Sequence, residues 1–307
     1  MKQKKLIIIL SSVVLGVVLL ILVLRIISDI IFPHTPPMGI ANHISSHQHT
    51  ERFRDYNEQI AFLFELSDKF TVYEIGTLSY PEYPDFPEYK MYKLSYGKTE
   101  TADTINYLFI SGMHGDEPAP VYAMRDFIQY LDSFDLLDNI TMDFFVILNP
   151  YGFEYNCTYN APGININRDF INFESLEVKY MMESIKDKTY TAVYDFHENP
   201  SAKGFYLYYY SGKNRTIVNN ILGLLQKYKV PLENEYVDVA FKAKNGAIYV
   251  PFYGKMFYLH MGKMASLALY FDRIKTGEVF VFETPTAMNI ENRKVINLML
   301  FRYLVGI

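Results

Sequence analysis

Hydrophobic and polar positions follow two different patterns along this chain of 307 residues. The first is an unbroken apolar run, LIIILSSVVLGVVLLILVL, which covers residues 6–24 without a charge. At an α-helical rise of about 1.5 Å per residue, its length approaches the ~30 Å hydrocarbon core of a bilayer. Three lysines precede the run, and Arg25, Asp29 and the Pro-rich FPHTPP follow it. This pattern predicts a transmembrane helix.

The flanks of the apolar run favour an uncleaved anchor over a signal peptide, which would have a shorter apolar core and a small-residue cleavage site. A buried core helix is disfavoured because the run is apolar on every face. By the positive-inside rule, the lysines place the N-terminus in the cytoplasm and the rest of the chain beyond the membrane, periplasmic or extracellular in a bacterium. We therefore expect a cytoplasmic stub with the anchor at 1–31, a tether at 32–49 and one domain at 50–307.

The second pattern, from about residue 50 onward, alternates strand-like runs with stretches of helical spacing. The strand-like runs are FTVYEIG, YKMYKLSY, INYLFIS, DFFVILN, TAVYDFH, GFYLYYY and EVFVFET. Apolar residues recur at helical spacing over 51–70, 118–134, 174–185, 215–228 and 289–303. Continuous apolar strands between amphipathic helices indicate a single α/β domain whose sheet is covered on both faces.

Composition excludes some classes of protein. The formal net charge of −5 and the pI near 5.8 argue against a nucleic-acid-binding protein, which normally carries a basic excess. Cys157 is the one cysteine of the sequence, so an intrachain disulfide is excluded and cysteine usage does not indicate a compartment.

Polar side chains follow the predicted strands, where α/β proteins place their sites. In chain order these side chains are His114 with Glu117, Asn167 with Arg168, His197, and Glu283. Each has an ordinary interpretation alone, as a turn, a hydrogen-bonded histidine or the start of a loop. Together, His114, Glu117 and His197 supply two imidazoles and one carboxylate, the protein ligands of a catalytic zinc site with an open fourth position.

Five short sequences between Gly112 and Pro285 carry a resemblance to a known family: HGDE, NPYGFEYN, GININRDF, DFHE and FETP. In order and in local sequence they resemble the zinc carboxypeptidases of peptidase family M14, including the succinylglutamate desuccinylase and aspartoacylase branch. The resemblance implies a mixed, mostly parallel sheet with helices on both faces, one Zn²⁺ per chain, and a peptide or N-acyl amino acid as substrate. The domain at 50–307 would then be the catalytic domain.

The resemblance also implies a role for each matching residue. The zinc ligands would be His114, Glu117 and His197. Glu283 would be the general base that takes a proton from the zinc-activated water and returns it to the leaving amine. Asn167 and Arg168 would bind the substrate's free carboxylate, for which a planar guanidinium is suited.

The chain departs from the family pattern at three places. Thr158 stands where an arginine often stabilises the developing oxyanion; substitutes from the sequence are Lys203, Lys255 and Arg273. Asn165 replaces an aspartate that orients a zinc-bound histidine, as in the desuccinylase branch, and an amide contributes less negative charge. The tyrosine that covers the substrate is left open among Tyr249, Tyr253 and Tyr258.

Two acidic neighbours of the expected ligands receive structural roles. Adjacent residues of a strand point to opposite faces, so Glu198 is expected to support or cap rather than bind metal. Asp116 is expected to cap the helix that begins near Pro118.

Three functions remain open from the sequence. The first is a membrane-anchored zinc metallocarboxypeptidase, whose location would bring cell-wall stem peptides within reach. The second is a zinc-dependent deacylase of N-acyl amino acids, favoured by Asn165 and Thr158. The third is a non-catalytic, membrane-tethered binding module, against which the intact set of ligands and base argues.

Overall fold

The computed structural model describes residues 51–81, 86–97, 103–134, 139–237, 241–256, 265–274 and 276–307, and the isolated residues 16, 19, 20 and 23. The predicted tether lies outside the described residues, as does the predicted anchor apart from those four positions. Within the part of the chain that is described, no helix is both long enough and apolar enough to cross a membrane.

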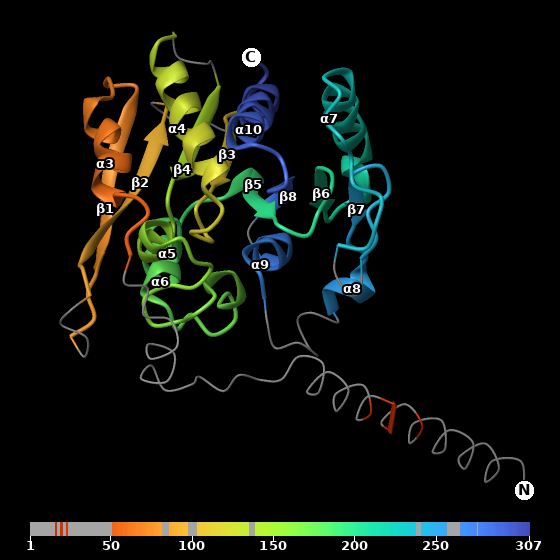
Figure 1. Ribbon diagram of the computed structural model, residues 1–307, viewed down its shortest axis with the longest axis horizontal. Helices are drawn as coiled ribbons and strands as arrows, with labels where there is room; N and C mark the ends of the chain where they lie inside the picture. Colours follow the sequence, from red (N-terminus) through yellow and green to blue (C-terminus); the bar gives the residue numbers. More distant parts are fainter. Residues whose placement is uncertain are drawn as a thin grey trace, which may run out of the picture.

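An eight-stranded sheet forms the centre of the described domain, in the order β1-β2-β4-β3-β5-β8-β6-β7 (Figure 1). Its strands are β1 (Phe70–Leu78), β2 (Tyr89–Tyr96), β3 (Ile105–Ile110), β4 (Ile140–Phe145), β5 (Tyr190–Asn199), β6 (Tyr206–Tyr209), β7 (Ala247–Tyr249) and β8 (Thr276–Pro285). The central strands β4, β3, β5 and β8 run parallel. The pairs β1/β2, β2/β4 and β6/β8 are antiparallel, and β7 pairs parallel with β6 at the edge. The sheet is therefore mixed, as predicted.

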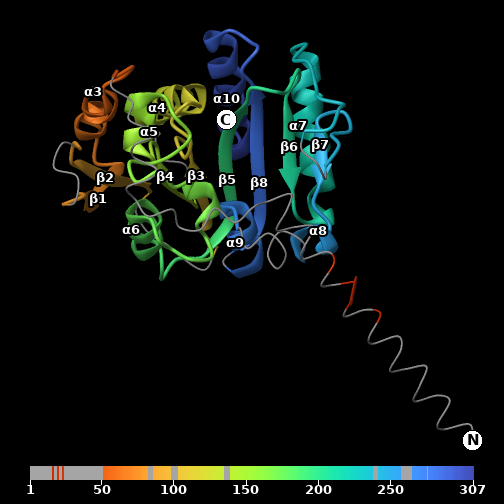
Figure 2. The same ribbon diagram turned by 60° about the horizontal axis from the view of Figure 1, so that its bottom comes forward.

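Helices cover both faces of the sheet (Figure 2). One face carries α4 (Pro118–Asp132), α7 (Arg215–Lys227) and α10 (Ile290–Val305). The other face carries α6 (Leu176–Ser184) and α9 (Leu267–Ile274). Three short helices, α3 (Tyr56–Ile60), α5 (Pro150–Tyr155) and α8 (Phe252–Met256), lie at loops and ends of the sheet. The predicted α/β fold with helices on both faces is confirmed.

An aromatic cluster joins the first face to the sheet. The ring of Phe301 on α10 lies 5.3 Å from that of Phe127 on α4 and 4.2 Å from that of Phe196 on β5. All of these side chains are buried. Burial of large aromatic side chains is a main source of core stability, so this cluster fixes α4 and α10 against the carboxyl half of the sheet.

Two predicted elements differ from the structure. The strand expected at 143–149 is β4 at Ile140–Phe145, and α5 begins soon after it at Pro150. Asn149 caps α5 by accepting a 2.9 Å hydrogen bond from the Gly152 amide, and proline suits the first helical turn. The long helix expected at 51–70 begins only after its N-cap Asp55 and consists of α3 followed by a 3₁₀ turn (Ala61–Glu65).

Candidate metal centre and active site

His114 and Glu117 lie in the loop that connects β3 to α4. Gly112, at φ +62°, turns the chain after β3, and its carbonyl accepts a 2.8 Å hydrogen bond from the Asn149 amide. An L side chain rarely adopts this backbone conformation, which explains glycine here. Pro118 begins α4, as predicted, directly after Glu117. The loop therefore holds both side chains above the carboxyl end of β3.

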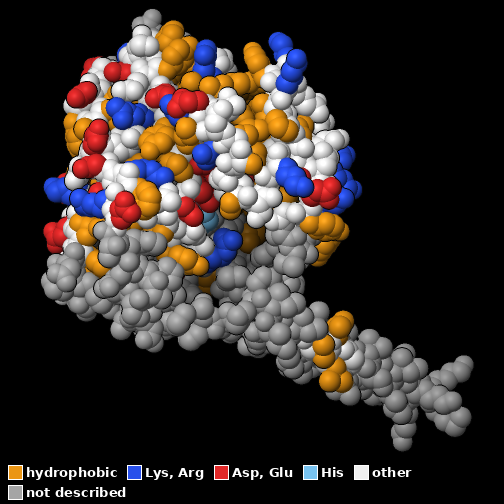
Figure 3. Space-filling model, viewed as in Figure 1, with side chains coloured by type: hydrophobic (Ala, Val, Ile, Leu, Met, Phe, Trp, Pro, Cys, Tyr) orange, Lys and Arg blue, Asp and Glu red, His pale blue; other side chains and the backbone are white. Residues whose placement is uncertain are grey.

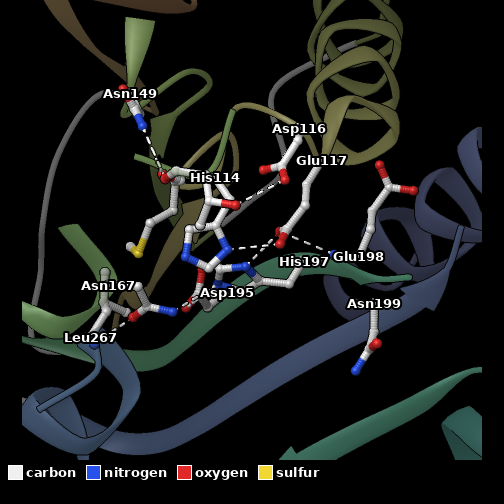
Figure 4. Close-up of polar contacts among 12 residues, drawn as sticks. His114, Asp116, Glu117, Asn149, Asn167, Asp195, His197, Glu198, Asn199 and Leu267 are labelled. Carbon is white, nitrogen blue, oxygen red and sulfur yellow. Dashed lines mark hydrogen bonds and ion pairs between the residues drawn. The ribbon is translucent and has the colours of Figure 1, made fainter. Parts of the chain in front are cut away.

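His197 joins these two side chains from β5 (Figure 4). The Nδ1 atoms of His114 and His197 each lie 2.7 Å from a different carboxylate oxygen of Glu117. Ligand atoms of the three residues all lie within 4.8 Å of one another. The structure thus brings together the three predicted metal ligands from two separate elements.

The outer nitrogens of both imidazoles have protein acceptors. His114 Nε2 lies 3.2 Å from Asn165 Oδ1, and His197 Nε2 lies 3.1 Å from Asp195 Oδ2. A proton on each Nε2 leaves a lone pair on each Nδ1, directed at the Glu117 carboxylate. In this neutral form the converging acceptors repel one another unless a positive charge lies between them, which either a metal ion or protons on the imidazoles can supply. The donor set therefore fits Zn²⁺.

Asp195 was not identified from the sequence, although its position two residues before His197 on the same strand places both side chains on one face. The Asp195 carboxylate places a negative charge beside His197, whereas the neutral Asn165 amide stands beside His114. Burial disfavours the charged form of His197, but Asp195 and Glu117 outweigh it and hold the pKa of that imidazole well above its usual value. Burial likewise disfavours the Glu117 carboxylate, yet the two imidazoles lower its pKa to about 2.

The acidic neighbours take different roles. Glu198 accepts a 2.9 Å hydrogen bond from the Ala119 amide at the start of α4 and forms an ion pair with Arg293 of α10. The expected supporting role of Glu198 is therefore confirmed. The predicted capping role of Asp116 is wrong, because its carboxylate accepts a 2.9 Å hydrogen bond from Thr158 Oγ1 and leaves the helix end to Glu198.

Glu283 lies on β8 in register with His197 on β5, so both side chains rise from the same face of the sheet. It lines a cavity of about 180 Å³ with the three metal-ligand residues. On the side of the molecule shown in Figure 3, a histidine surface is visible in a hollow bordered by acidic and basic side chains. Burial raises the pKa of Glu283 to about 8, and the nearby Glu117 and Asp195 carboxylates act in the same direction.

Asn167 and Arg168 lie in a 3₁₀ turn (Ile166–Arg168), and both line this cavity. The oxygen of the Asn167 side-chain amide accepts a 3.1 Å hydrogen bond from the Leu267 amide, which fixes this side chain within the protein. Arg168 is exposed, and its Nη1 donates to the Asn167 carbonyl at 2.8 Å. The guanidinium is thus held at the cavity wall, while carboxylate binding by the pair stays a prediction.

Several candidates from the sequence do not reach the cavity. Tyr249 and Tyr253 are exposed and absent from its walls, and Tyr258 lies outside the described residues. Lys255 forms an ion pair with Asp272 at 2.8 Å. Among the described residues that line the cavity, the one lysine or arginine is Arg168. The residues suggested from the sequence as oxyanion substitutes do not line the cavity: Lys203, Lys255 and Arg273.

The cavity walls contain residues that the sequence did not indicate. They lie in or next to β6, in the segment 241–250, in α9 or just before it, and in β8. These residues are Tyr208, Tyr210, Phe241, Val250, Ser266, Ala268, Leu269 and Val281. Tyr208 reaches the cavity wall because β6 pairs antiparallel with β8. This pairing aligns Tyr206 with Glu283 and Tyr208 with Val281. This pairing is not evident from a single sequence.

Comparison with known proteins supports the resemblance. Residues 103–234 match the family profile of the succinylglutamate desuccinylase/aspartoacylase catalytic domain. The matched region contains His114, Glu117 and His197 and ends before Glu283. No protein of curated function matches the chain in sequence. The resemblance noted from the motifs is thereby confirmed.

Solved structures show the same fold. A proposed metallopeptidase of Shewanella denitrificans superposes with a TM-score of 0.65 at 18% identity, over 82% of this chain and 88% of that one. A metallo-carboxypeptidase of Burkholderia cenocepacia gives 0.57 at 15% identity, over 82% and 67% of the two chains. A metallo-carboxypeptidase of Pseudomonas aeruginosa, in complex with (2-guanidinoethylmercapto)succinic acid, gives 0.55 at 14% identity, over 82% and 67%. The chain therefore has the metallo-carboxypeptidase fold.

Proposed function

We propose that this protein is a zinc-dependent metallocarboxypeptidase that hydrolyses an amide bond adjacent to a free carboxylate. The observation that carries the proposal is the convergence of His114, Glu117 and His197 at one wall of a cavity that also holds Glu283 and Arg168. Zinc bound to such a set polarises the scissile carbonyl and lowers the pKa of water towards ~7. Hydrolysis then depends on where the chain places the substrate and moves the proton.

Glu283 is the proposed general base and acid. As the water oxygen bonds to the carbonyl carbon, the Glu283 carboxylate accepts the water proton. It returns this proton to the amide nitrogen when the C–N bond breaks and the amine leaves. Its position beside the ligands, rather than among them, leaves the carboxylate free for this transfer.

Arg168 is the proposed anchor for the substrate's carboxylate. An exposed guanidinium at the cavity wall can bind a carboxylate through two parallel hydrogen bonds, which fixes the scissile bond near the end of the substrate. The apolar walls would take the side chain of the terminal residue; they include Val250, Ala268, Leu269 and Val281.

A second candidate function is deacylation of N-acyl amino acids, which has the same bond chemistry but a smaller acyl group. Asn165 beside His114 and the match to the desuccinylase and aspartoacylase catalytic domain favour it. The hydroxyl of Thr158, bonded to Asp116, cannot supply the cationic group that peptidases of this family often place there.

Location bears on the choice between these substrates. We propose that the run at 6–24 anchors the chain with the N-terminus in the cytoplasm and the catalytic domain outside, because of the lysines before it. Cell-wall stem peptides, which end in free carboxylates, would then be within reach in a bacterium.

The test is to incubate the full-length chain with zinc and a mixture of peptides, muropeptides and N-acyl amino acids, and to identify the products by mass. We expect about one zinc per chain by elemental analysis, with release of a single C-terminal residue. His114→Ala is expected to lose both zinc and turnover. Release only of short acyl groups would establish the deacylase instead. Zinc binding without turnover of any substrate would support the binding module, and absence of zinc would overturn both proposed enzymes.

A further inference from the structure

Arg54 connects the N-terminal segment of the described domain to the loop that carries two metal ligands. It lies in the non-helical stretch 51–55 that precedes α3 and is remote in sequence from every residue of the site. This stretch passes beside α5 (Figure 1). It also lies before the region matched by the family profile, so the resemblance assigns it no role.

The Arg54 guanidinium donates to three acceptors that belong to two different elements. Its Nη1 lies 3.0 Å from the Gly115 carbonyl and 2.9 Å from the Phe153 carbonyl. Its Nη2 lies 2.7 Å from Asn156 Oδ1. Gly115 stands between His114 and Glu117, whereas Phe153 and Asn156 lie at the C-terminal end of α5. One planar group therefore bridges the metal-ligand loop and a helix end.

The surfaces that Arg54 bridges are already in close contact. A Cβ atom at Gly115 would lie only 1.7 Å from the carbonyl carbon of Gly152, so the loop rests directly on the α5 backbone. The Gly115 amide donates to the carbonyl of Cys157, the residue after the α5 C-cap, at 3.0 Å. Arg54 also stacks on Phe153, with 5.1 Å between the guanidinium carbon and the ring centroid.

Arginine is suited to this position for two physical reasons. Its fixed fork of donors can serve several acceptors at once, which a lysine ammonium on a flexible stem cannot reproduce. A cation is also stabilised next to the carbonyls at a helix C-terminus. Without the guanidinium, two backbone carbonyls beside the site would lose their partner, and the loop would lose its tie to α5.

We propose that Arg54 is a positioning residue for the metal centre, which holds the loop between His114 and Glu117 in the geometry that binds the ion. This inference rests on the zinc site of the proposed function. It assigns the segment before α3 a part in metal affinity, in addition to its part in the fold. The residue touches neither the ion nor the substrate and acts through the Gly115 backbone.

Arg52 provides a matched control in the same segment. Its guanidinium lies 2.8 Å from Glu154, which is almost fully buried, and its partners Glu154 and Tyr155 both belong to α5. Arg52→Met is therefore expected to weaken the fold without moving the ligands. Arg54→Met makes the same substitution two residues further along the chain. Comparison of the two variants therefore separates an effect on metal binding from a general loss of stability.

The experiment measures the zinc dissociation constant of the full-length chain by competition with a chromogenic chelator, together with the thermal unfolding of the metal-free protein. Supports of metal ligands typically contribute 10–100-fold to affinity, so we expect Arg54→Met to weaken zinc binding by about tenfold. Arg54→Lys should give an intermediate value. Arg52→Met should bind zinc as tightly as the wild type despite a lower melting temperature.

A second variant and two contrary outcomes keep the proposal testable. If Arg54→Met does not fold, Asn156→Gly removes one of the three acceptors while glycine keeps the left-handed backbone at φ +53°, and it should weaken zinc binding by a smaller factor. The proposal would be overturned if the folded Arg54 variant, Arg54→Met or Arg54→Lys, and Asn156→Gly all bound zinc as tightly as the wild type. Absence of zinc binding by the wild type would instead overturn the proposed function itself.

Discussion

Two carboxylates that line the cavity, Glu117 and Glu283, differ in their charged neighbours. The imidazoles on both sides of Glu117 stabilise its anion and lower its pKa to about 2, although burial acts in the opposite direction. Burial and neighbouring carboxylates raise the pKa of Glu283 to about 8. When the surroundings move the pKa values of two carboxylates apart in this way, the two groups are suited to different tasks. Permanent charge suits a ligand, whereas a readily gained proton suits a base.

Glu283→Gln is therefore expected to abolish proton transfer without disturbing the metal. Loss of a general base typically costs 10²–10⁴-fold in rate, so kcat should fall by about this factor while the zinc content stays at the wild-type value. Rates at saturating substrate and elemental analysis measure the two quantities. Glu278→Gln, earlier on the same strand and absent from the cavity walls, is the control and should retain full activity. A Glu283→Gln variant with wild-type kcat would remove Glu283 from the mechanism.

Among the elements, α6 supports the loop that leads to Asn167 and Arg168. Glu177 in its first turn is completely buried and accepts a 3.0 Å hydrogen bond from Asn160 Nδ2 and a 3.2 Å bond from the Tyr80 hydroxyl. Asn160 in turn accepts from the Ile164 amide at 2.7 Å, which closes the turn before the cavity. A buried carboxylate thus fixes the shape of a loop that lines the site.

The stability of the protein should depend on pH through Glu177. Burial raises the pKa of Glu177 from 4.5 to about 6, so between these values the folded chain holds a proton that the unfolded chain has released. Stability contributed by the protonated form is present below the lower value and is lost as the pH rises through the upper one. The shift corresponds to about 2 kcal/mol.

Glu177→Gln lacks this proton and tests the effect directly. Relative to the wild type, the variant should gain about 2 kcal/mol in unfolding free energy between pH 4 and pH 7.5. Urea unfolding at both pH values measures the change, and all other groups titrate alike in the two proteins. A constant difference between variant and wild type across this range would contradict the assignment.

The contact between the metal-ligand loop and α5 makes a second prediction for the elements. Gly115→Ala places a methyl group 1.7 Å from the Gly152 carbonyl carbon, so the loop must move and zinc binding should be lost or strongly weakened. Gly223→Ala is the control, since a Cβ there meets nothing within 4 Å and α7 is helical at this position. That change should raise the unfolding free energy by about 0.5–1 kcal/mol. Unchanged zinc affinity in Gly115→Ala would show that the contact is soft.

The elements also show which features a single sequence can predict. Strands that begin and end within apolar runs, such as β2 at Tyr89–Tyr96, coincide with the expectation, because period and composition agree over their whole length. The expected strand at 143–149 was extended too far because Val146, Ile147 and Leu148 continue its apolar character. The following Asn149 and Pro150 are helix-start signals, so α5 could have been predicted from its cap.

The site divides in the same way. His114, Glu117, His197 and Glu283 could be predicted because each follows or ends a recognisable strand, and strand ends meet at one edge of a parallel sheet. Tyr208 and Arg54 could not be predicted. The first depends on the antiparallel pairing of β6 with β8, and the second on a non-helical segment that contacts α5 only in the folded chain. Both depend on long-range contacts that leave no local pattern.

At the scale of the whole molecule, the proposed metal centre joins parts of the chain that are far apart in sequence. The loop after β3 would supply two ligands and β5 the third, while β8 places Glu283 beside β5. Unfolding separates these residues, so an ion bound by all three ligands binds the folded state in preference to the unfolded one. Metal affinity and fold stability are therefore linked quantities.

Removal of zinc should consequently destabilise the entire domain. With free zinc at one hundred times its dissociation constant, binding adds about 2.7 kcal/mol to the unfolding free energy, which for a domain of this size corresponds to roughly 5–10 °C in melting temperature. Thermal unfolding of the full-length chain with zinc and with excess chelator measures the shift. His114→Ala should melt at the same temperature in both conditions, because it lacks a ligand. A wild-type melting temperature that ignores zinc would mean that the three side chains do not bind the ion together, even if each contacts it singly.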